Sequence, residues 1–248
     1  MKKTNLFNNT MRLYLKNLLT NFGHKKLWTQ HCYSEDGEDS VLRAFYETKW
    51  DYKGFYIDIG AYHPIHLSNT QWFYEQGWSG VNIDATPGSM KAFYKIRTRD
   101  VNVETGVSDE YGELEFSVYG STSTVNRFHS GTSKDLEQEK PLKKIQVRVQ
   151  PINALLDKYV PKNQHIDFIS IDVEGFELKI LQSFNFDKYS PDYFLIEELD
   201  FKNRDIIEYV TSPIYLLLKE KEYIVVAKTQ RTIIFKKKTS GLYNRENS

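Results

Sequence analysis

Four apolar runs of the sequence end in acidic residues, and carboxylates in such positions can bind hydroxyl groups, remove protons or hold a hard cation. Short apolar runs rich in β-branched residues predict buried strands. The acids at their ends are Asp58, Asp84, the pair Asp172 and Glu174, and the pair Glu197 and Glu198. Because the carboxyl ends of parallel strands meet at one edge of an open α/β sheet, we expect these acids to share one cleft.

Strands and helices must alternate to place acids in this way, and they do so after residue 33. The sequence predicts strands at 54–61, 80–85, 100–107, 114–119, 145–149, 165–172 and 193–198. It predicts helices at 70–76, 87–97, 151–160, 175–184 and 203–219, the last with a break at Pro213. Residues 223–227 and 232–235 predict a C-terminal hairpin. The expected fold class is therefore α/β, a doubly wound and mostly parallel sheet that ends in an antiparallel hairpin.

The turn after the first strand indicates the kind of ligand. Gly60 lets the backbone approach a bound molecule, and Asp84, 24 residues further on, can accept hydrogen bonds from ribose hydroxyls. The residues that follow Gly60 are Ala61-Tyr62-His63-Pro64, so the chain has no G-x-G-x-x-G motif to hold a pyrophosphate. An adenosine ligand without phosphates fits better, and S-adenosylmethionine is such a ligand.

Composition excludes several classes of protein. The chain has 248 residues, 33 Lys+Arg against 33 Asp+Glu, and one cysteine. A net charge of +0 gives no general attraction to a polyanion, so we expect no nucleic-acid partner. Cys32 alone cannot form an internal disulfide, which favours a cytoplasmic location. No apolar run approaches the ~20 residues of a spanning helix, and no transmembrane segment is expected.

Residues 1–32 predict an N-terminal helical arm, and residues 33–248 predict the main domain. The apolar residues within 6–22 recur three or four positions apart, with basic residues off that stripe. Such a helix packs on the domain or on a second subunit of a homodimer, or it makes peripheral contact with an anionic membrane. Within the domain, residues 120–142 are rich in Ser, Thr, Gly and charge, and predict a substrate loop.

Several segments resemble the FkbM-type S-adenosylmethionine-dependent methyltransferases. They are 56–61, 67–70, 77–85, 87–88, 166–177 and 194–197, and residues 34–39 resemble the segment that precedes the first strand in that family. The most specific block is Ile171-Asp172-Val173-Glu174-Gly175-Phe176-Glu177. The resemblance implies a class I methyltransferase (Rossmann-like) fold and methyl transfer to oxygen. It also implies a small-molecule or glycan acceptor, such as a sugar hydroxyl of a bacterial surface polysaccharide or glycolipid precursor.

The resemblance and the strand ends together give the expected site. Cofactor contacts are expected from Asp58, Gly60, Ala61, Asn69, Asp84, Ala85, Ser108 and Asp172. An alcohol is a weak nucleophile and needs a base or a metal, so we expect Glu174 to be the general base, with Asp172 and His63 as further catalytic residues. The expected ligands of an optional Mg²⁺ are Asp172, Glu197 and Glu198. If the strand continues through Asp172 and Glu174, both side chains face the cleft.

Other interpretations stay open. Asp58 and Asp84 could merely cap turns, Glu177 could compensate a helix dipole, and His63 could be an incidental loop residue. A non-catalytic methyltransferase-fold module in glycan assembly would fail to bind S-adenosylmethionine. An NAD-dependent oxidoreductase would bind NADH, although the missing phosphate loop and the terminal hairpin count against it.

Overall fold

The computed structural model describes residues 30–46, 51–120, 126–128, 140–198 and 205–238. The chain divides into two compact units, Met1–His31 and Cys32–Ser248, and the second unit is described here. The helix predicted at 6–22 and much of the loop predicted at 120–142 lie outside the described residues. Within the described ranges, every helix is too short or too polar to cross a membrane.

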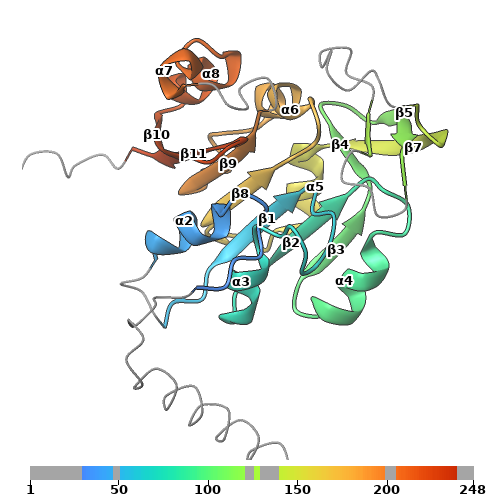
Figure 1. The fold of residues 1–248 in the computed structure, drawn as a ribbon, viewed down its shortest axis with the longest axis horizontal. Coiled ribbons are helices and arrows are strands. Elements are labelled where there is room, and N and C mark those ends of the chain that lie inside the picture. The colour runs from blue at the N-terminus through green and yellow to red at the C-terminus, as the bar shows by residue number, and fades with distance from the viewer. Residues whose placement is uncertain (1–29, 47–50, 121–125, 129–139, 199–204, 239–248) are drawn as a thin grey trace, which may run out of the picture. The chain divides into compact units, whose positions relative to one another are not determined.

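The central sheet has the predicted α/β arrangement (Figure 1). In the described part of the chain it contains β1 (Phe55–Ile59), β2 (Ser79–Asp84), β3 (Val101–Glu104), β8 (Phe168–Ile171), β9 (Tyr193–Glu197), β10 (Tyr223–Lys228) and β11 (Thr232–Lys237). The strand order is β10-β11-β9-β8-β1-β2-β3. The five strands from β3 to β9 pair in parallel, whereas β11 is antiparallel to both β9 and β10. The doubly wound sheet with a C-terminal antiparallel hairpin is thereby confirmed.

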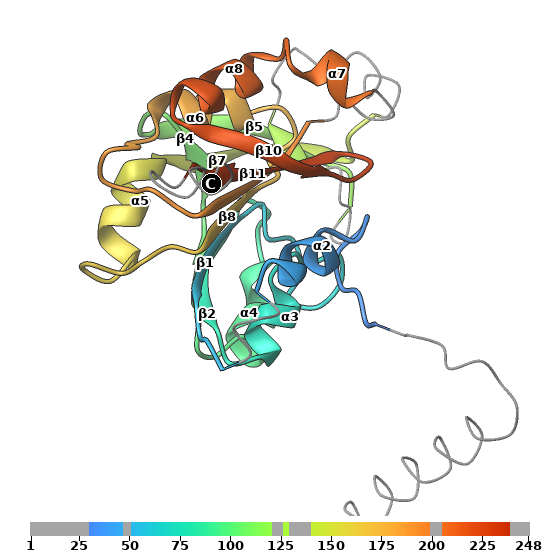
Figure 2. The same cartoon turned by 90° about the vertical axis from the view of Figure 1, so that its left-hand side faces the viewer.

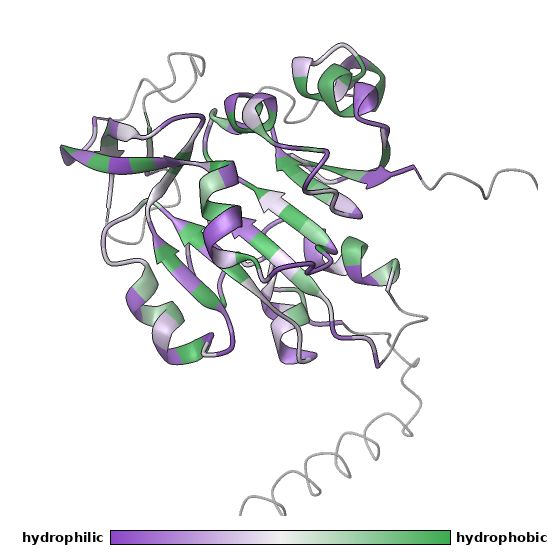
Figure 3. Cartoon of the chain, turned by 180° about the vertical axis from the view of Figure 1, so that it is seen from behind, coloured by the Kyte–Doolittle hydropathy of each residue, from purple (hydrophilic) through white to green (hydrophobic). Residues whose placement is uncertain are grey.

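Helices cover both faces of this sheet, because successive strand residues point to opposite sides. In β1, Tyr56 packs with residues of α2 and α3, whereas Ile57 belongs to the cluster that includes residues of α5, α6 and α8. Figure 2 shows these two groups of helices on opposite sides, and Figure 3 shows the hydrophobic strands between them. The helices are α2 (Glu38–Ala44), α3 (Gln71–Glu75), α4 (Met90–Ile96), α5 (Ile152–Tyr159), α6 (Glu177–Ser183), α7 (Ile206–Tyr209) and α8 (Pro213–Glu220).

The break predicted at Pro213 is the start of α8. Ser212 is the N-cap, and its hydroxyl accepts a hydrogen bond from the backbone N–H of Tyr215 at 3.0 Å. Proline is favoured in the first turn because it has no N–H to leave unsatisfied there. The predicted long helix is therefore two short ones.

A second, smaller sheet was not predicted. Within the described residues its order is β4-β7-β5-β6, formed by β4 (Gly106–Ser108), β7 (Lys143–Pro151), β5 (Gly112–Val118) and β6 (Arg127–Phe128). The single strand expected at 100–107 is wrong, since the chain leaves the central sheet after Glu104 and pairs with β7 from Gly106. Thr105 makes this transition, and its hydroxyl donates to the carbonyl of Arg148 at 3.2 Å.

A buried arginine fixes the segment that follows β1. Arg97 is 0% exposed and forms an ion pair with Asp100 at 2.9 Å. Its guanidinium also donates to the Pro64 carbonyl at 3.0 Å and to the Thr70 hydroxyl at 2.9 Å. The Thr70 hydroxyl in turn donates to Asp58 at 2.9 Å. A buried charge is tolerated only with such partners, so this network holds the loop beside β1 in one arrangement.

Candidate active site

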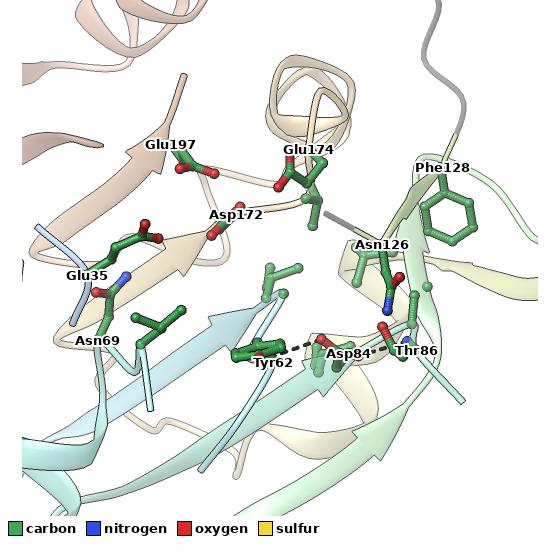
Figure 4. Close-up of a pocket in the computed structure, with 18 of the residues that line it drawn as sticks. Glu35, Tyr62, Asn69, Asp84, Thr86, Asn126, Phe128, Asp172, Glu174 and Glu197 are labelled. Carbon is green, nitrogen blue, oxygen red and sulfur yellow. Dashed lines mark hydrogen bonds between the residues drawn. The ribbon is translucent and has the colours of Figure 1, made fainter. Parts of the chain in front are cut away.

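A cavity of about 250 Å³ lies at the carboxyl ends of the central strands (Figure 4). Each of four neighbouring strands β2, β1, β8 and β9 brings a residue to it: Asp84, Gly60, Asp172 and Glu197. This is the edge of an open α/β sheet at which ligands bind. Of the acids expected to share one cleft, Asp84, Asp172, Glu174 and Glu197 line this cavity.

One wall of the cavity is built by the turn after β1 and the end of β2. Gly60 has a positive φ of 84°, and its N–H donates to the carbonyl of Ile83 at 2.9 Å. The carboxylate of Asp84 accepts from the backbone N–H of Tyr62 at 3.0 Å and of Thr86 at 2.7 Å. Burial raises the pKa of Asp84, and these two N–H groups oppose the shift. Since a carboxylate has about four acceptor positions, Asp84 can still accept from a ligand.

The adjoining wall is mainly apolar and comes partly from the smaller sheet. Val107, Phe116 and Phe128 line it, and the last two rings meet edge to face with centroids 4.9 Å apart. Asn126 lines it too, while its side chain holds the backbone N–H of Tyr119 at 2.7 Å. Two residues of the predicted 120–142 loop, Asn126 and Phe128, therefore lie at the cavity. Such an apolar wall can accommodate a flat aromatic ring.

Three carboxylates converge across the cavity from Asp84 (Figure 4). Those of Asp172, Glu174 and Glu197 each offer an oxygen atom within 4.8 Å of the others. Asp172 and Glu197 come together because Ile171 of β8 pairs with Ile196 of β9. Burial and the nearby carboxyl groups of Glu197 and Glu174 raise the pKa of Asp172 well above its usual range. Such a cluster favours a bound proton or cation.

Glu174 reaches this cluster by a turn, and the expectation that the strand continues through it is wrong. The strand β8 ends at Ile171, and Glu174 has a left-handed φ of 56°. Glu177, at the start of α6, accepts from the backbone N–H of Val173 at 2.9 Å and of Gly175 at 3.0 Å. Burial raises the pKa of Glu177 to about 7. The Glu177 carboxyl thus fixes the turn that presents Glu174.

Other expected site residues lie outside the cavity lining. Glu198 accepts a hydrogen bond from the Tyr209 hydroxyl at 2.7 Å, so Glu174 rather than Glu198 completes the acidic cluster. The His63 ring accepts from the N–H of Ile65 and His66 within its own loop, and burial with the neighbouring His66 lowers its pKa. The remaining three are Asp58 in the Arg97 network, Ala61 packed with Met90 and Phe93, and buried Ser108 in β4.

Two further expected residues do line the cavity. Asn69 lies at its edge, and its amide donates to the Ser170 hydroxyl at 3.0 Å. Ala85 follows Asp84 directly and lines the same wall. These positions are compatible with the cofactor contacts that the sequence predicts for them.

The segment 34–39, which the resemblance included, is tied to the hairpin by a contact that the sequence did not predict. Glu35, Asp36 and Glu38 line the cavity, together with Arg231 from the turn between β10 and β11. Arg231 forms an ion pair with Asp36 at 3.0 Å and another with Glu35. About 195 positions separate these partners, so no local pattern could have indicated the contact.

Residues 58–225, about two thirds of the chain, match the family model described as the methyltransferase FkbM domain. No curated protein matches the chain. Among solved structures, an FkbM methyltransferase from Methylobacillus flagellatus is 13% identical with a TM-score of 0.42, over 75% of this chain and 44% of that one. The chain thus spans less than half of that protein.

Two other solved structures are similar over more of their length. A TehB-like SAM-dependent methyltransferase from Corynebacterium glutamicum is 9% identical with a TM-score of 0.40, over 95% of this chain and 100% of that one. A 1,6-didemethyltoxoflavin-N1-methyltransferase from Burkholderia thailandensis, with bound 1,6-didemethyltoxoflavin and S-adenosylhomocysteine, is 12% identical with a TM-score of 0.40, over 94% and 90% of the two chains.

Proposed function

The chain belongs to the FkbM methyltransferase domain family, and we propose that it transfers the methyl group of S-adenosylmethionine to a sugar hydroxyl. Its sheet is the class I methyltransferase sheet expected from the sequence. The proposed acceptor is the sugar of a bacterial surface polysaccharide or glycolipid precursor, and the proposed location is the cytoplasm. The observation that carries the proposal is the cluster of three carboxylates in the same cavity as Asp84.

The wall at Gly60 and Asp84 fits S-adenosylmethionine. Asp84 is fixed by backbone N–H groups and can accept from ribose hydroxyls. Gly60 lines the cavity without a side chain, and a Cβ there would collide with the backbone of Asp172, so glycine is required at this turn. Val107 and Phe128 offer an apolar wall for the adenine ring. When bound, S-adenosylmethionine supplies an electrophilic methyl group on a sulfonium.

Glu174 is the proposed general base. The hydroxyl of the acceptor must lose its proton as its oxygen attacks, and a positioned carboxylate can take that proton. The raised pKa of Asp172 favours retention of a proton on that side chain. Glu197 pairs with Arg231 at 3.9 Å, so Glu174, held by its turn on the same side of the cavity, is the carboxylate proposed to accept the proton of the hydroxyl.

The same acids could instead hold a cation. Asp172, Glu174 and Glu197 offer only oxygen atoms, which are the ligands that Mg²⁺ and Ca²⁺ prefer. In that form of the proposal the cation would hold the acceptor oxygen near the cluster. Activity that persists after exhaustive treatment with EDTA would remove the cation from the proposal and leave Glu174 as the base.

The direct test is methyl transfer from labelled S-adenosylmethionine to glycan precursors, with nucleotide sugars assayed separately. We expect Glu174→Gln to lower kcat by about 10²–10⁴-fold, the usual contribution of general-base catalysis. The affinity for S-adenosylhomocysteine should be unchanged, because Glu174 lies across the cavity from Asp84. The matched control is Glu115→Gln, whose side chain is 44% exposed on the smaller sheet.

Two results would contradict the proposal. Near-normal kcat in Glu174→Gln would exclude that residue as the base. Failure of the wild-type chain to bind S-adenosylmethionine or S-adenosylhomocysteine would favour a non-catalytic binding module.

A further inference from the structure

A second cluster of metal-ligating side chains lies at the opposite end of the strands that carry the acidic site. His165 and Asp167 precede β8, and Asp192 precedes β9. Each offers a nitrogen or oxygen atom within 4.8 Å of the others. Asp172 and Glu197 lie at the carboxyl ends of the same two strands, so this cluster is separate from the candidate active site.

The central member, Asp167, has an unsatisfied buried oxygen. Asp167 is only 1% exposed. Oδ2 accepts from the backbone N–H of Phe55 at 2.8 Å, and the Tyr52 hydroxyl interacts with the carboxyl group, whereas Oδ1 has no partner with hydrogen-bond geometry within the described residues. Burial raises the pKa of Asp167, and interactions with Phe55 N–H and the Tyr52 hydroxyl oppose this. A buried carboxylate oxygen without a partner is destabilising, so a ligand that satisfies it would stabilise the fold.

The other two members are already spaced as ligands of one ion. His165 Nε2 and Asp192 Oδ2 are 3.1 Å apart. Two ligand atoms that each lie about 2.0 Å from a tetrahedral zinc ion are about 3.3 Å apart. The side chain of His165 is 53% exposed and that of Asp192 is 40% exposed, which leaves a path from solvent. The buried oxygen of Asp167 would be the innermost ligand.

The charge of the cluster also favours a cation. Asp167 and Asp192 are two carboxylates, His165 is the ion-pair partner of Asp192, and in the described part of the chain no Lys or Arg forms an ion pair with either carboxylate. A neutral imidazole with two carboxylates suits zinc and similar transition ions, whereas Mg²⁺ prefers a set of oxygen ligands. This cluster and the acidic cluster of the candidate active site are therefore expected to differ in the metal they prefer.

We propose that His165, Asp167 and Asp192 bind a divalent transition-metal ion of the zinc type, remote from the candidate active site. Because Asp167 also holds the N–H of Phe55 at the start of β1, the ion links the amino-terminal ends of β1, β8 and β9. Its role is structural, and the inference holds whether or not the chain transfers methyl groups.

The test is calorimetric titration of the metal-free full chain with Zn²⁺ in the presence of excess Mg²⁺, which competes at the all-oxygen cluster. We expect one Zn²⁺ per chain and a melting temperature that rises with Zn²⁺ concentration. His165→Ala should lower the Zn²⁺ affinity by more than about 100-fold, because loss of an outer-shell partner alone costs about 10–100-fold. His66→Ala, which removes another exposed histidine, should bind Zn²⁺ as the wild type does.

Glu197→Gln distinguishes the two clusters, since it alters the active-site acids alone. Retained Zn²⁺ binding in Glu197→Gln together with its loss in His165→Ala supports the proposal. Absence of Zn²⁺ binding by the wild type, or loss in Glu197→Gln with retention in His165→Ala, would overturn it. Asp192→Asn, at a half-exposed position, repeats the test should His165→Ala fail to fold as judged by circular dichroism.

Discussion

Gly60 and Asp172 approach so closely that no side chain fits between them. A Cβ atom added to Gly60 would lie 1.7 Å from the carbonyl oxygen of Asp172. The two residues follow β1 and β8, which pair in parallel. Their contact joins the turn proposed for the cofactor to the acidic cluster proposed for the acceptor. A reaction between two bound molecules requires such proximity of their sites.

We expect Gly60→Ala to be strongly destabilising. The new methyl group must displace the backbone of Asp172, directly after β8, and the positive φ of 84° is itself unfavourable for alanine. The expected loss is at least about 2 kcal/mol of unfolding free energy, measured by urea denaturation. Gly37→Ala is the matched control, because Gly37 has φ +92° but nothing within 4 Å of the added Cβ. Equal losses for the two variants would show that the contact with Asp172 does not matter.

Asp84→Asn should weaken cofactor binding. The amide of asparagine retains one acceptor oxygen, but its NH₂ group can only donate. One of the three donors that Asp84 serves, the N–H of Tyr62, the N–H of Thr86 or the ligand, therefore loses its acceptor. Loss of a hydrogen bond to a charged acceptor predicts at least about a tenfold higher Kd for S-adenosylhomocysteine by calorimetry. Glu104→Gln is the control. Glu104 is exposed on the neighbouring strand β3, and its carboxylate likewise accepts from a backbone N–H, that of Gly88. An unchanged Kd in Asp84→Asn would remove Asp84 from the proposed cofactor contacts.

The central sheet could be predicted because its strands are apolar runs that end in acids and glycines. The strands β5 and β7 were predicted in part, but not that they form a separate sheet, since β4, which joins that sheet to the chain leaving β3, is only Gly106–Ser108. Nothing in the run from Val101 to Ser108 marks Thr105 as the point where the chain changes sheets. At this point Thr105 bonds to Arg148 and the following residues pair with β7, both far along the chain.

The candidate site, like the fold, could be predicted only where its residues follow neighbouring strands of the central sheet. Asp172 and Glu197 follow neighbouring strands, so strand pairing alone brings them together. Glu174 lies near them because of a left-handed turn, so strand periodicity predicted its position beside Asp172 for the wrong reason. Arg231 lies in a hairpin turn and reaches the cavity only through long-range folding, for which sequence spacing has no signal.

Glu177 should make stability depend on pH. Its folded-state pKa is raised to about 7 by burial, above the ordinary value of 4.5, so the folded chain binds a proton that the unfolded chain releases between these values. This contribution to stability is fully present below about pH 4.5 and is lost as pH rises through about 7. The predicted loss is up to about 3 kcal/mol over this window.

The measurement is the free energy of unfolding in urea at several pH values for the wild type and for Glu177→Gln. Glutamine does not titrate, so the decline between pH 4.5 and 7 should be shallower in the variant. Asp58, whose pKa burial raises to about 6, contributes a decline of the same sign in both proteins. Identical slopes for the two proteins would mean that Glu177 titrates normally in the folded chain.

Arg231→Met should loosen the segment that carries Glu35, Asp36 and Glu38. Arg231 is the cation that joins this segment to the hairpin, and its side chain is only 19% exposed, so the ion pairs are less screened than surface pairs. Without it, Glu35 and Asp36 lose a partner and repel the nearby Glu197. We expect faster amide hydrogen exchange over residues 33–38 and a higher KM for the acceptor, with little change in the affinity for S-adenosylhomocysteine.

Lys144→Met is the matched control for this variant. Lys144 pairs with Glu115 at 2.7 Å, but their side chains are 52% and 44% exposed, and such surface pairs contribute about 0–1 kcal/mol. Exchange over residues 33–38 should therefore stay as in the wild type. If Arg231→Met also left that exchange unchanged, the hydrogen bond from the Ser68 N–H to the Tyr33 carbonyl, together with the Thr229–Glu38 contact, would suffice to hold the segment at the cavity.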